Sequence, residues 1–197
     1  MNDREELSFR RALTVNEIVL FENGDSYPVC PRCLISIERE YMSNIDEKQT
    51  LLATCGGEVI KLSDINDEVF SSGMLGDGFG IIPDGKDFYS PIDGVITNAH
   101  ESGHAYMITS HTGVELLVHL GINTVELEGE YFSPVVKVNM RVSKGDKLAY
   151  ADTEKIKERG YDPVAVCIIT NTEKIEQFKI TYGKVNPKDA VMEFTLK

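Results

Sequence analysis

The chain has 197 residues, 42% of them hydrophobic and 26% charged, and a formal net charge of −12 at pH 7. This length suffices for one substantial domain plus an extension, and no apolar run approaches the roughly 20 residues of a membrane span. Because nucleic acids are bound through clusters of Lys and Arg, the acidic balance argues against a nucleic-acid partner and favours a basic protein partner.

The first residues, MNDREELSFRRAL, are charged and lack the apolar core of a secretory signal. We therefore expect a cytoplasmic protein. In that reducing compartment the four cysteines are expected to be thiols rather than disulfides. Cys55 and Cys167 stand in apolar strand contexts and are predicted to lie in the core.

Residues 1–47 differ from the rest of the chain, because they are rich in charge and show no clear period. We predict that they form an extension of unknown role. Within it, Cys30-Pro-Arg-Cys33 has the spacing of half a zinc knuckle, yet tetrahedral zinc needs four ligands and no second CxxC follows. A degenerate or dimer-shared zinc site and a plain turn with two free thiols both fit this motif.

From Leu51 onward, short alternating apolar runs are separated by glycine. Short strands at turn-rich spacing are typical of a β-sandwich or barrel. We therefore predict that residues 48–197 form one all-β domain, an antiparallel β-sandwich or barrel–sandwich hybrid. The runs are GEVIKL, GFGII, GVITNA, HAYMIT, GVELLVHLGI, KLAYA and PVAVCII.

Two motifs in this domain resemble ligand-binding signatures. GDGFG at residues 76–80 is too short for a dinucleotide fingerprint and opens no helix, so it is predicted to be a turn. HESGH at residues 100–104 matches the HExxH string of zinc proteases, which needs both histidines on one face of a helix. Because strands precede and follow it, a zinc hydrolase using His100, Glu101 and His104 is only a remote alternative.

Next comes a predicted hairpin, whose second strand carries Val114, Leu116, Val118 and Leu120 on one face. Ser110 and Gly113 suit the first and fourth positions of a type I turn. If the loop has two or four residues, the numbers of each pair of facing residues sum to 223, and His104 lies opposite His119. A three-residue loop would break that register.

Directly paired side chains lie about 5 Å apart at Cβ, so the two imidazoles would share one small anion, metal ion or proton. We expect both rings on the face opposite the Val/Leu stripe, beside Leu117 and Tyr106. An apolar patch that holds a titratable pair suits a docking surface with chemistry.

One or two short helices complete the predicted fold. The first covers Thr153 to Arg159, with Asp152 as N-cap and Gly160 as the stop. The second is the EKIEQF segment at residues 173–178.

These motifs together resemble the glucose-type enzyme IIA domain of the bacterial phosphoenolpyruvate-dependent sugar phosphotransferase system. The resemblance runs from about Leu51 to Phe194 through GEVIKLSDINDEVFSSGMLGDGFGIIP, SPIDGVITNAHESGHAYMITSHTGVELLVHLGINTVEL, VSKGDKLAYAD and DPVAVCIITN, and does not cover the first 47 residues. It implies a histidine phosphoryl carrier with an antiparallel β-sandwich fold.

The resemblance assigns roles to individual residues. His119 accepts the phosphoryl group on its tele nitrogen from the phosphocarrier HPr and passes it to an enzyme IIB domain for sugar uptake. His104 lies beside it and stabilises the phosphoryl group, Ser102 orients His104, and the carbonyl of Gly121 fixes the tautomer of His119. No metal or other cofactor is required.

The family also has an apolar docking disc rimmed by acids that meet basic residues of HPr. The matching positions here are Phe70, Met74, Leu75, Leu117 and, on the rim, Asp67. Two positions depart from the family pattern: Asn123 stands where many members carry aspartate, and His100 where an aromatic residue often lies.

A second function stays open on the sequence alone. The same patch suits a regulatory module that docks on metabolic enzymes or permeases and is switched by phosphorylation of His119. The sequence does not name the sugar, since specificity in this system lies in the membrane component.

Overall fold

The computed structural model describes residues 13–15, 18–20, 26–28 and 48–197. The chain divides into two compact units, Met1–Glu47 and Lys48–Lys197. In the first unit, strands β1 (Leu13–Val15), β2 (Ile18–Leu20) and β3 (Ser26–Pro28) pair antiparallel in sequence order. Cys30 and Cys33 lie outside the described residues, so the zinc knuckle stays a prediction.

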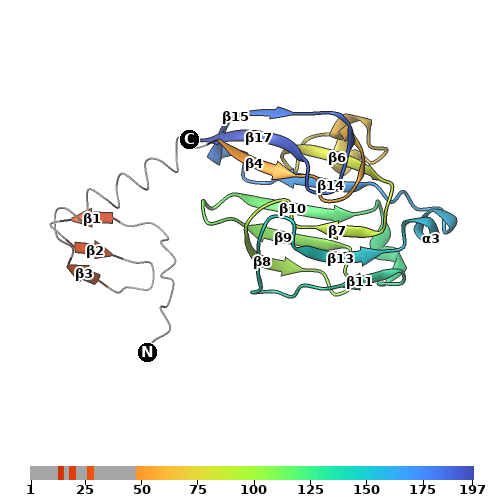
Figure 1. Ribbon diagram of the computed structural model, residues 1–197, viewed down its shortest axis with the longest axis horizontal. Helices are drawn as coiled ribbons and strands as arrows, with labels where there is room; N and C mark the ends of the chain where they lie inside the picture. Colours follow the sequence, from red (N-terminus) through yellow and green to blue (C-terminus); the bar gives the residue numbers. More distant parts are fainter. Residues whose placement is uncertain (1–12, 16–17, 21–25, 29–47) are drawn as a thin grey trace. The chain divides into compact units, whose positions relative to one another are not determined.

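An eight-stranded antiparallel sheet with the order β12-β8-β9-β10-β14-β6-β5-β16 forms the centre of the second unit (Figure 1). Its strands are β5 (Gly57–Lys61), β6 (Asp77–Pro83), β8 (Gly94–Ala99), β9 (Ala105–Thr109), β10 (Glu115–Leu120), β12 (Arg141–Val142), β14 (Ala165–Ile169) and β16 (Gly183–Val185).

Two three-stranded sheets, with the orders β11-β13-β7 and β15-β17-β4, complete the strands described in this unit. They consist of β4 (Gln49–Leu52), β7 (Asp87–Tyr89), β11 (Phe132–Pro134), β13 (Lys147–Ala151), β15 (Ile175–Ile180) and β17 (Ala190–Leu196). The predicted antiparallel all-β sandwich is confirmed.

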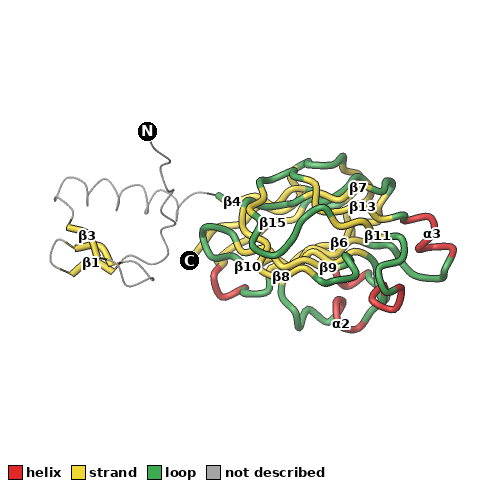
Figure 2. The backbone as a smooth tube through the Cα atoms, turned by 90° about the horizontal axis from the view of Figure 1, so that it is seen from below, coloured by secondary structure: helices red, strands yellow, loops and turns green. Residues whose placement is uncertain are grey.

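The eight-stranded sheet is covered on both faces. Figure 2 shows it between β7 and β13 on one side and helix α2 (Glu68–Ser71) on the other. The main core lies on the β7 and β13 side and includes Phe88, Val118 and Leu148. A smaller cluster on the α2 side is formed by Ile65, Phe70, Ile122, Val164, Val166 and Ile168.

This two-sided burial explains the sequence pattern of the strands. In β10, Leu116, Val118 and Leu120 are at most 1% exposed, while Leu117 and His119 between them face the α2 side. The neighbouring strand β14 is buried at every position, because it is covered on both faces. Burial of Cys167 in β14 raises the pKa of its thiol to about 12, as expected for a core cysteine.

The β9–β10 hairpin differs from the predicted register by one residue. His119 pairs with Ala105, and Leu116 with Ile108, so paired numbers sum to 224 rather than 223. The predicted turn is present, since the N–H of Gly113 donates to the carbonyl of Ser110. However, the N–H of Ser110 donates to the carbonyl of Val114, so the loop between the paired residues has three residues. Gly113, at φ 77°, adopts the left-handed conformation that inserts this extra residue.

The register change moves one side chain to the other face. Tyr106 pairs with Val118 and lies in the main core at 1% exposure, so its predicted place beside the histidine pair is wrong. Its hydroxyl donates to the carbonyl of Gly103 at 2.8 Å and fixes the turn before β9.

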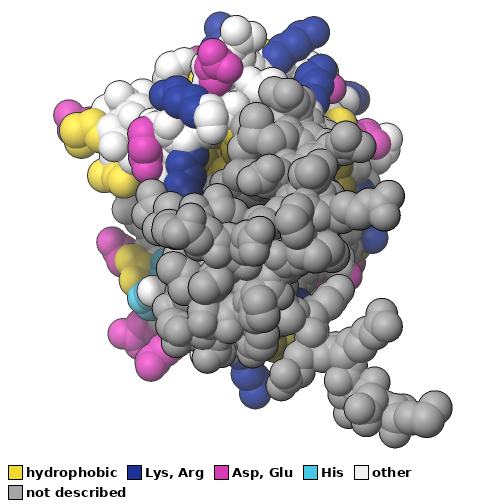
Figure 3. Space-filling view, turned by 90° about the vertical axis from the view of Figure 1, so that its left-hand side faces the viewer, with side chains coloured by type: hydrophobic (Ala, Val, Ile, Leu, Met, Phe, Trp, Pro, Cys, Tyr) yellow, Lys and Arg dark blue, Asp and Glu magenta, His cyan; other side chains and the backbone are white. Residues whose placement is uncertain are grey.

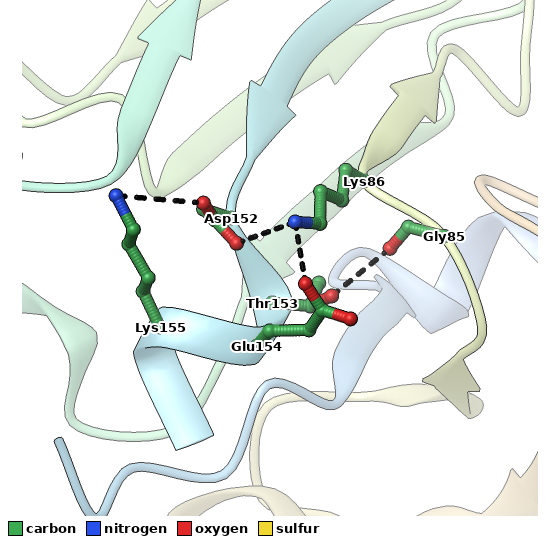
Figure 4. A network of polar contacts seen from close by, with 6 residues as sticks. All are labelled: Gly85, Lys86, Asp152, Thr153, Glu154 and Lys155. Carbon is green, nitrogen blue, oxygen red and sulfur yellow. Dashed lines mark hydrogen bonds and ion pairs between the residues drawn. The ribbon is translucent and has the colours of Figure 1, made fainter. Parts of the chain in front are cut away.

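Helix α3 (Thr153–Glu158) forms where predicted, with Asp152 at the N-cap position and Gly160 just past its end at φ 88°. The Asp152 side chain makes no capping bond, however. It pairs instead with Lys86, whose Nζ lies 2.9 Å from Oδ1 of Asp152 and 2.7 Å from Oε2 of Glu154 (Figure 4). The contact with Lys86 lowers the pKa of Asp152, and the two ion pairs tie α3 to the β6–β7 loop.

The predicted helix at residues 173–178 is wrong. A short 3-10 helix, η3 (Thr172–Lys174), precedes strand β15. β15 pairs with β17 and buries Ile175, because backbone pairing outweighs the weak helical pattern of the segment.

The described part of the chain contains two other short 3-10 helices, η1 (Leu62–Asp64) and η2 (Thr124–Leu127). Among the helices of the described residues, none has the length and hydrophobicity to cross a membrane.

Strand packing predicts a severe effect at Gly78, which pairs with Ile168 in β14. A Cβ at this position would collide with the backbone carbonyl of Cys167, which no side-chain movement relieves. We expect Gly78→Ala to lower the free energy of unfolding by about 3 kcal/mol. Gly85→Ala is the matched control, since a Cβ there meets nothing within 4 Å. Urea unfolding that shows equal stability for both variants would contradict the packing described here.

Candidate functional site

The site is built around His119, which the central sheet presents on its α2 side. His119 pairs with Ala105 in β9 and Val166 in β14. Directly paired residues point to the same face, so its ring lies beside the smaller cluster rather than in the main core. There it contacts the buried ring of Phe70, with centroids 5.2 Å apart at 57°.

One hydrogen bond fixes the tautomer of His119. Its Nδ1 lies 2.8 Å from the carbonyl oxygen of Gly121. Because a carbonyl only accepts, Nδ1 must carry the proton, and the neutral ring keeps an unprotonated Nε2. The bond between His119 and Gly121 implied by the family resemblance is therefore present.

Neighbouring backbone holds the Gly121 carbonyl in place. The N–H of Gly121 donates to Val164 at 2.9 Å, and the N–H of Ile122 donates to Asp162 at 2.8 Å. The buried hydroxyl of Thr124 donates to the carbonyl of Leu120 at 2.7 Å. Thr124 was not predicted from the sequence, since a threonine in a turn carries no distinguishing signal.

His104 lies beside His119, although not by the predicted cross-strand pairing. The two ring centroids are 4.9 Å apart at 72°. His104 precedes the first residue of β9, where strand alternation does not apply, and its carbonyl accepts from the N–H of Leu120 at 2.7 Å. Its side chain is buried at 4% exposure, so the two rings form one compact pair.

The HESGH segment is a turn. The N–H of Gly103 donates to the carbonyl of His100 at 2.8 Å, and no helix covers residues 100–104. The helical face that a zinc hydrolase needs is therefore absent, and that remote alternative is wrong. Within residues 48–197, no group of three His, Cys, Asp or Glu side chains is arranged to hold a metal ion.

This turn places Ser102 between two imidazoles. Its Oγ hydrogen-bonds Nδ1 of His104, and it also lies 2.8 Å from Nδ1 of His100. The contact with His104 is the one expected of an orienting residue. The contact with His100 was not predicted, because it depends on the turn that brings the two side chains together.

The environment of the pair keeps both rings neutral. Burial, with Coulomb repulsion from His119 and His100, lowers the pKa of His104 to about 4. Burial also lowers the pKa of His119, against opposing contributions from the Gly121 hydrogen bond and the Asp67 carboxylate. A neutral imidazole with a bare Nε2 is the reactive form of a histidine nucleophile.

The predicted docking residues differ in how much of their surface is exposed. Phe70 is only 7% exposed and packs against His119, so it supports the ring rather than offering contact area. Met74 is 79% exposed, whereas Leu75 and Leu117 are half-buried over the smaller cluster. Asp67 is half-buried, and its carboxylate caps α2 by accepting from the N–H groups of Val69 and Phe70.

Two further exposed apolar side chains near the site were not predicted from the sequence. Val69 in α2 and Val125 in η2 are 51% and 49% exposed on the elements next to the site. Asn123 is exposed at the start of η2, where it adopts φ 57°. Figure 3 shows one face of the molecule on which a histidine reaches the surface among hydrophobic and acidic side chains.

Comparisons with known proteins agree on one family. The family profile described as phosphoenolpyruvate-dependent sugar phosphotransferase system, EIIA 1, matches residues 49–175. The chain is 36% identical over 152 residues to the PTS system glucose-specific EIIA component of Bacillus cereus, covering 76% of this chain and 92% of that protein.

Longer relatives and a solved structure extend this result. The PTS system beta-glucoside-specific EIIBCA component of Bacillus subtilis is 42% identical over 137 residues, which is 69% of this chain but only 22% of that protein. The structure of glucose permease IIA from Mycoplasma capricolum superposes with a TM-score of 0.69 at 34% identity, covering 75% of this chain and 96% of that one.

The lowered pKa of His104 predicts how stability depends on pH. An unfolded histidine titrates near 6.5, whereas His104 in the native state titrates near 4, so below pH 6.5 the unfolded chain binds the extra proton. Stability is then lost as the pH falls from about 6.5 to about 4. Between about pH 7.5 and about pH 5, the shift of His104 should account for about 2 kcal/mol of lost unfolding free energy.

His104→Gln removes this ionisation. Urea unfolding at both pH values should show that the variant loses about 2 kcal/mol less stability than the wild type across that interval. Equal losses in the two proteins would contradict a neutral, desolvated His104.

Proposed function

The chain belongs to the EIIA 1 family of the phosphoenolpyruvate-dependent sugar phosphotransferase system, and on this basis we propose that it is a phosphoryl carrier that uses His119. The observation that carries the proposal is the hydrogen bond from Nδ1 of His119 to the Gly121 carbonyl. It leaves Nε2 as a bare nucleophile on a half-buried ring.

The transfer follows from this geometry. Nε2 of His119 attacks the phosphorus of a phosphohistidine on the donor protein, so a new N–P bond forms as the donor's N–P bond breaks. The electron pair of the broken bond returns to the donor's ring nitrogen. Because His119 already carries its proton on Nδ1, it keeps the same hydrogen bond before and after transfer.

His104 supplies charge stabilisation in this proposal. Its ring lies next to that of His119, close enough to donate to a phosphoryl oxygen once it is protonated. A positive charge about 4 Å from the phosphoryl group contributes about 4 kcal/mol per unit charge at an effective dielectric of about 20. The pKa of His104 is low in the free site, and the negative charge of the phosphoryl group raises it. His104 therefore gains its proton as the group arrives.

The partners follow from the family. We propose that HPr is the donor and an enzyme IIB domain the acceptor. The beta-glucoside-specific relatives are named as EIIBCA components, and the chain spans about a quarter of their length. The exposed Val69, Met74 and Val125 offer an apolar contact area, and the acidic charge of the chain suits a basic donor.

No cofactor takes part in this proposal, because the imidazoles supply both the nucleophile and the stabilising charge. We also propose that the chain acts in the cytoplasm, where phosphoenolpyruvate is available.

A regulatory module switched by phosphorylation would use the same surface, and no contact in the structure favours that function over the phosphoryl carrier.

Two substitutions test the assignment. With enzyme I, HPr and phosphoenolpyruvate, the wild type should gain one acid-labile phosphate at residue 119. His119→Ala should gain none, because the nucleophile is lost. His104→Ala should still accept phosphate, yet pass it to an enzyme IIB domain on the order of a hundredfold more slowly.

Mass spectrometry of intact protein and mapped peptides measures acceptance, and a rapid-quench assay measures onward transfer. His111→Ala is the control, since His111 is exposed in the β9–β10 turn. Unimpaired labelling of His119→Ala would reject the assignment.

A further inference from the structure

We propose that His100 is a positioning residue for phosphoryl transfer, which acts through Ser102 to fix the proton of His104 on Nδ1. The inference rests on the proposed function and adds a third histidine to its site. The family resemblance implies an aromatic residue in place of His100, so the inference concerns the histidine that this chain has there.

Three side chains form a continuous hydrogen-bonded chain. Oγ of Ser102 bonds Nδ1 of His104 on one side and lies 2.8 Å from Nδ1 of His100 on the other. The rings of His100 and His104 are 4.4 Å apart between centroids. His100 is exposed and His104 is buried, so the chain runs from the surface to the catalytic pair.

A third contact shows which group donates and which accepts in each of these hydrogen bonds. The backbone N–H of Ser102 points at Nδ1 of His100 at 3.3 Å. A backbone N–H only donates, so Nδ1 of His100 must be the accepting nitrogen without a proton. The hydroxyl of Ser102 therefore donates to His100, and its oxygen accepts from Nδ1–H of His104.

This direction determines what His104 does when the phosphoryl group arrives. With Nδ1 already protonated, His104 gains its second proton on Nε2 and becomes an imidazolium. Its Nδ1–H then donates to Ser102, whose own proton is held by His100. Charge-assisted hydrogen bonds are the stronger ones, so the chain favours this cationic form beside the phosphoryl dianion.

Loss of the acceptor at residue 100 reverses the donor–acceptor direction of the Ser102–His104 hydrogen bond. In His100→Phe, which keeps a planar ring but has no ring nitrogen, the Ser102 hydroxyl has no acceptor there and turns to donate to Nδ1 of His104. The neutral His104 then carries its proton on Nε2. His100→Asn is the matched variant, since its amide oxygen replaces the accepting nitrogen without a titratable ring.

The experiment has two readouts on nitrogen-15-labelled protein. Long-range proton–nitrogen correlation spectra of the imidazoles should place the His104 proton on Nδ1 in the wild type and in His100→Asn, and on Nε2 in His100→Phe. The equilibrium constant for phosphoryl exchange with HPr should shift about fivefold toward phospho-HPr in His100→Phe only, the value of one hydrogen bond.

A double-mutant cycle separates this role from a general structural one. Ser102→Ala breaks the same chain at its centre, so adding His100→Phe to it should change the exchange constant no further. His111→Asn is the control for a remote exposed histidine and should match the wild type.

Three results would overturn the inference while leaving the proposed function intact. They are a wild-type His104 protonated on Nε2, an unchanged tautomer and exchange constant in His100→Phe, or additive effects in the cycle. A wild type that accepts no phosphate would instead reject the proposed function itself.

Discussion

The hydrogen bond from Nδ1–H of His119 to the carbonyl of Gly121 is the constraint on which the site depends. It leaves the opposite ring nitrogen bare. The backbone after α3 holds this carbonyl, since Val164 accepts from the N–H of Gly121. α3 in turn is tied to the β6–β7 loop through Lys86 and Asp152. The tautomer of His119 thus depends on contacts between segments that are far apart in the sequence.

The two-faced sheet explains how a buried scaffold carries a reactive surface. Alternation sends Val118 into the main core and His119 to the α2 side, where Phe70 supports its ring. Burial of His104 lowers its pKa to about 4, so the free site holds two neutral rings. In the proposed transfer, a dianionic phosphoryl group on His119 changes that balance and so couples protonation of His104 to phosphorylation.

Much of this was predictable from residue patterns. The strand character of β10 follows from alternation, and α3 from Asp152 and Gly160 at its ends. The register of the β9–β10 hairpin was not, because the left-handed Gly113 adds one loop residue that spacing alone does not reveal. His104 meets His119 because a turn, not a strand, presents it. The role of Ser102 between two rings likewise depends on turn geometry.

The most direct test of the account is to locate the phosphorus on the ring of His119. Phosphorylated protein labelled with nitrogen-15 should show phosphorus–nitrogen coupling to Nε2, with Nδ1 still protonated and hydrogen-bonded to Gly121. Coupling to Nδ1, or an Nδ1 that lacks its proton, would contradict the claim that this one hydrogen bond determines which nitrogen reacts.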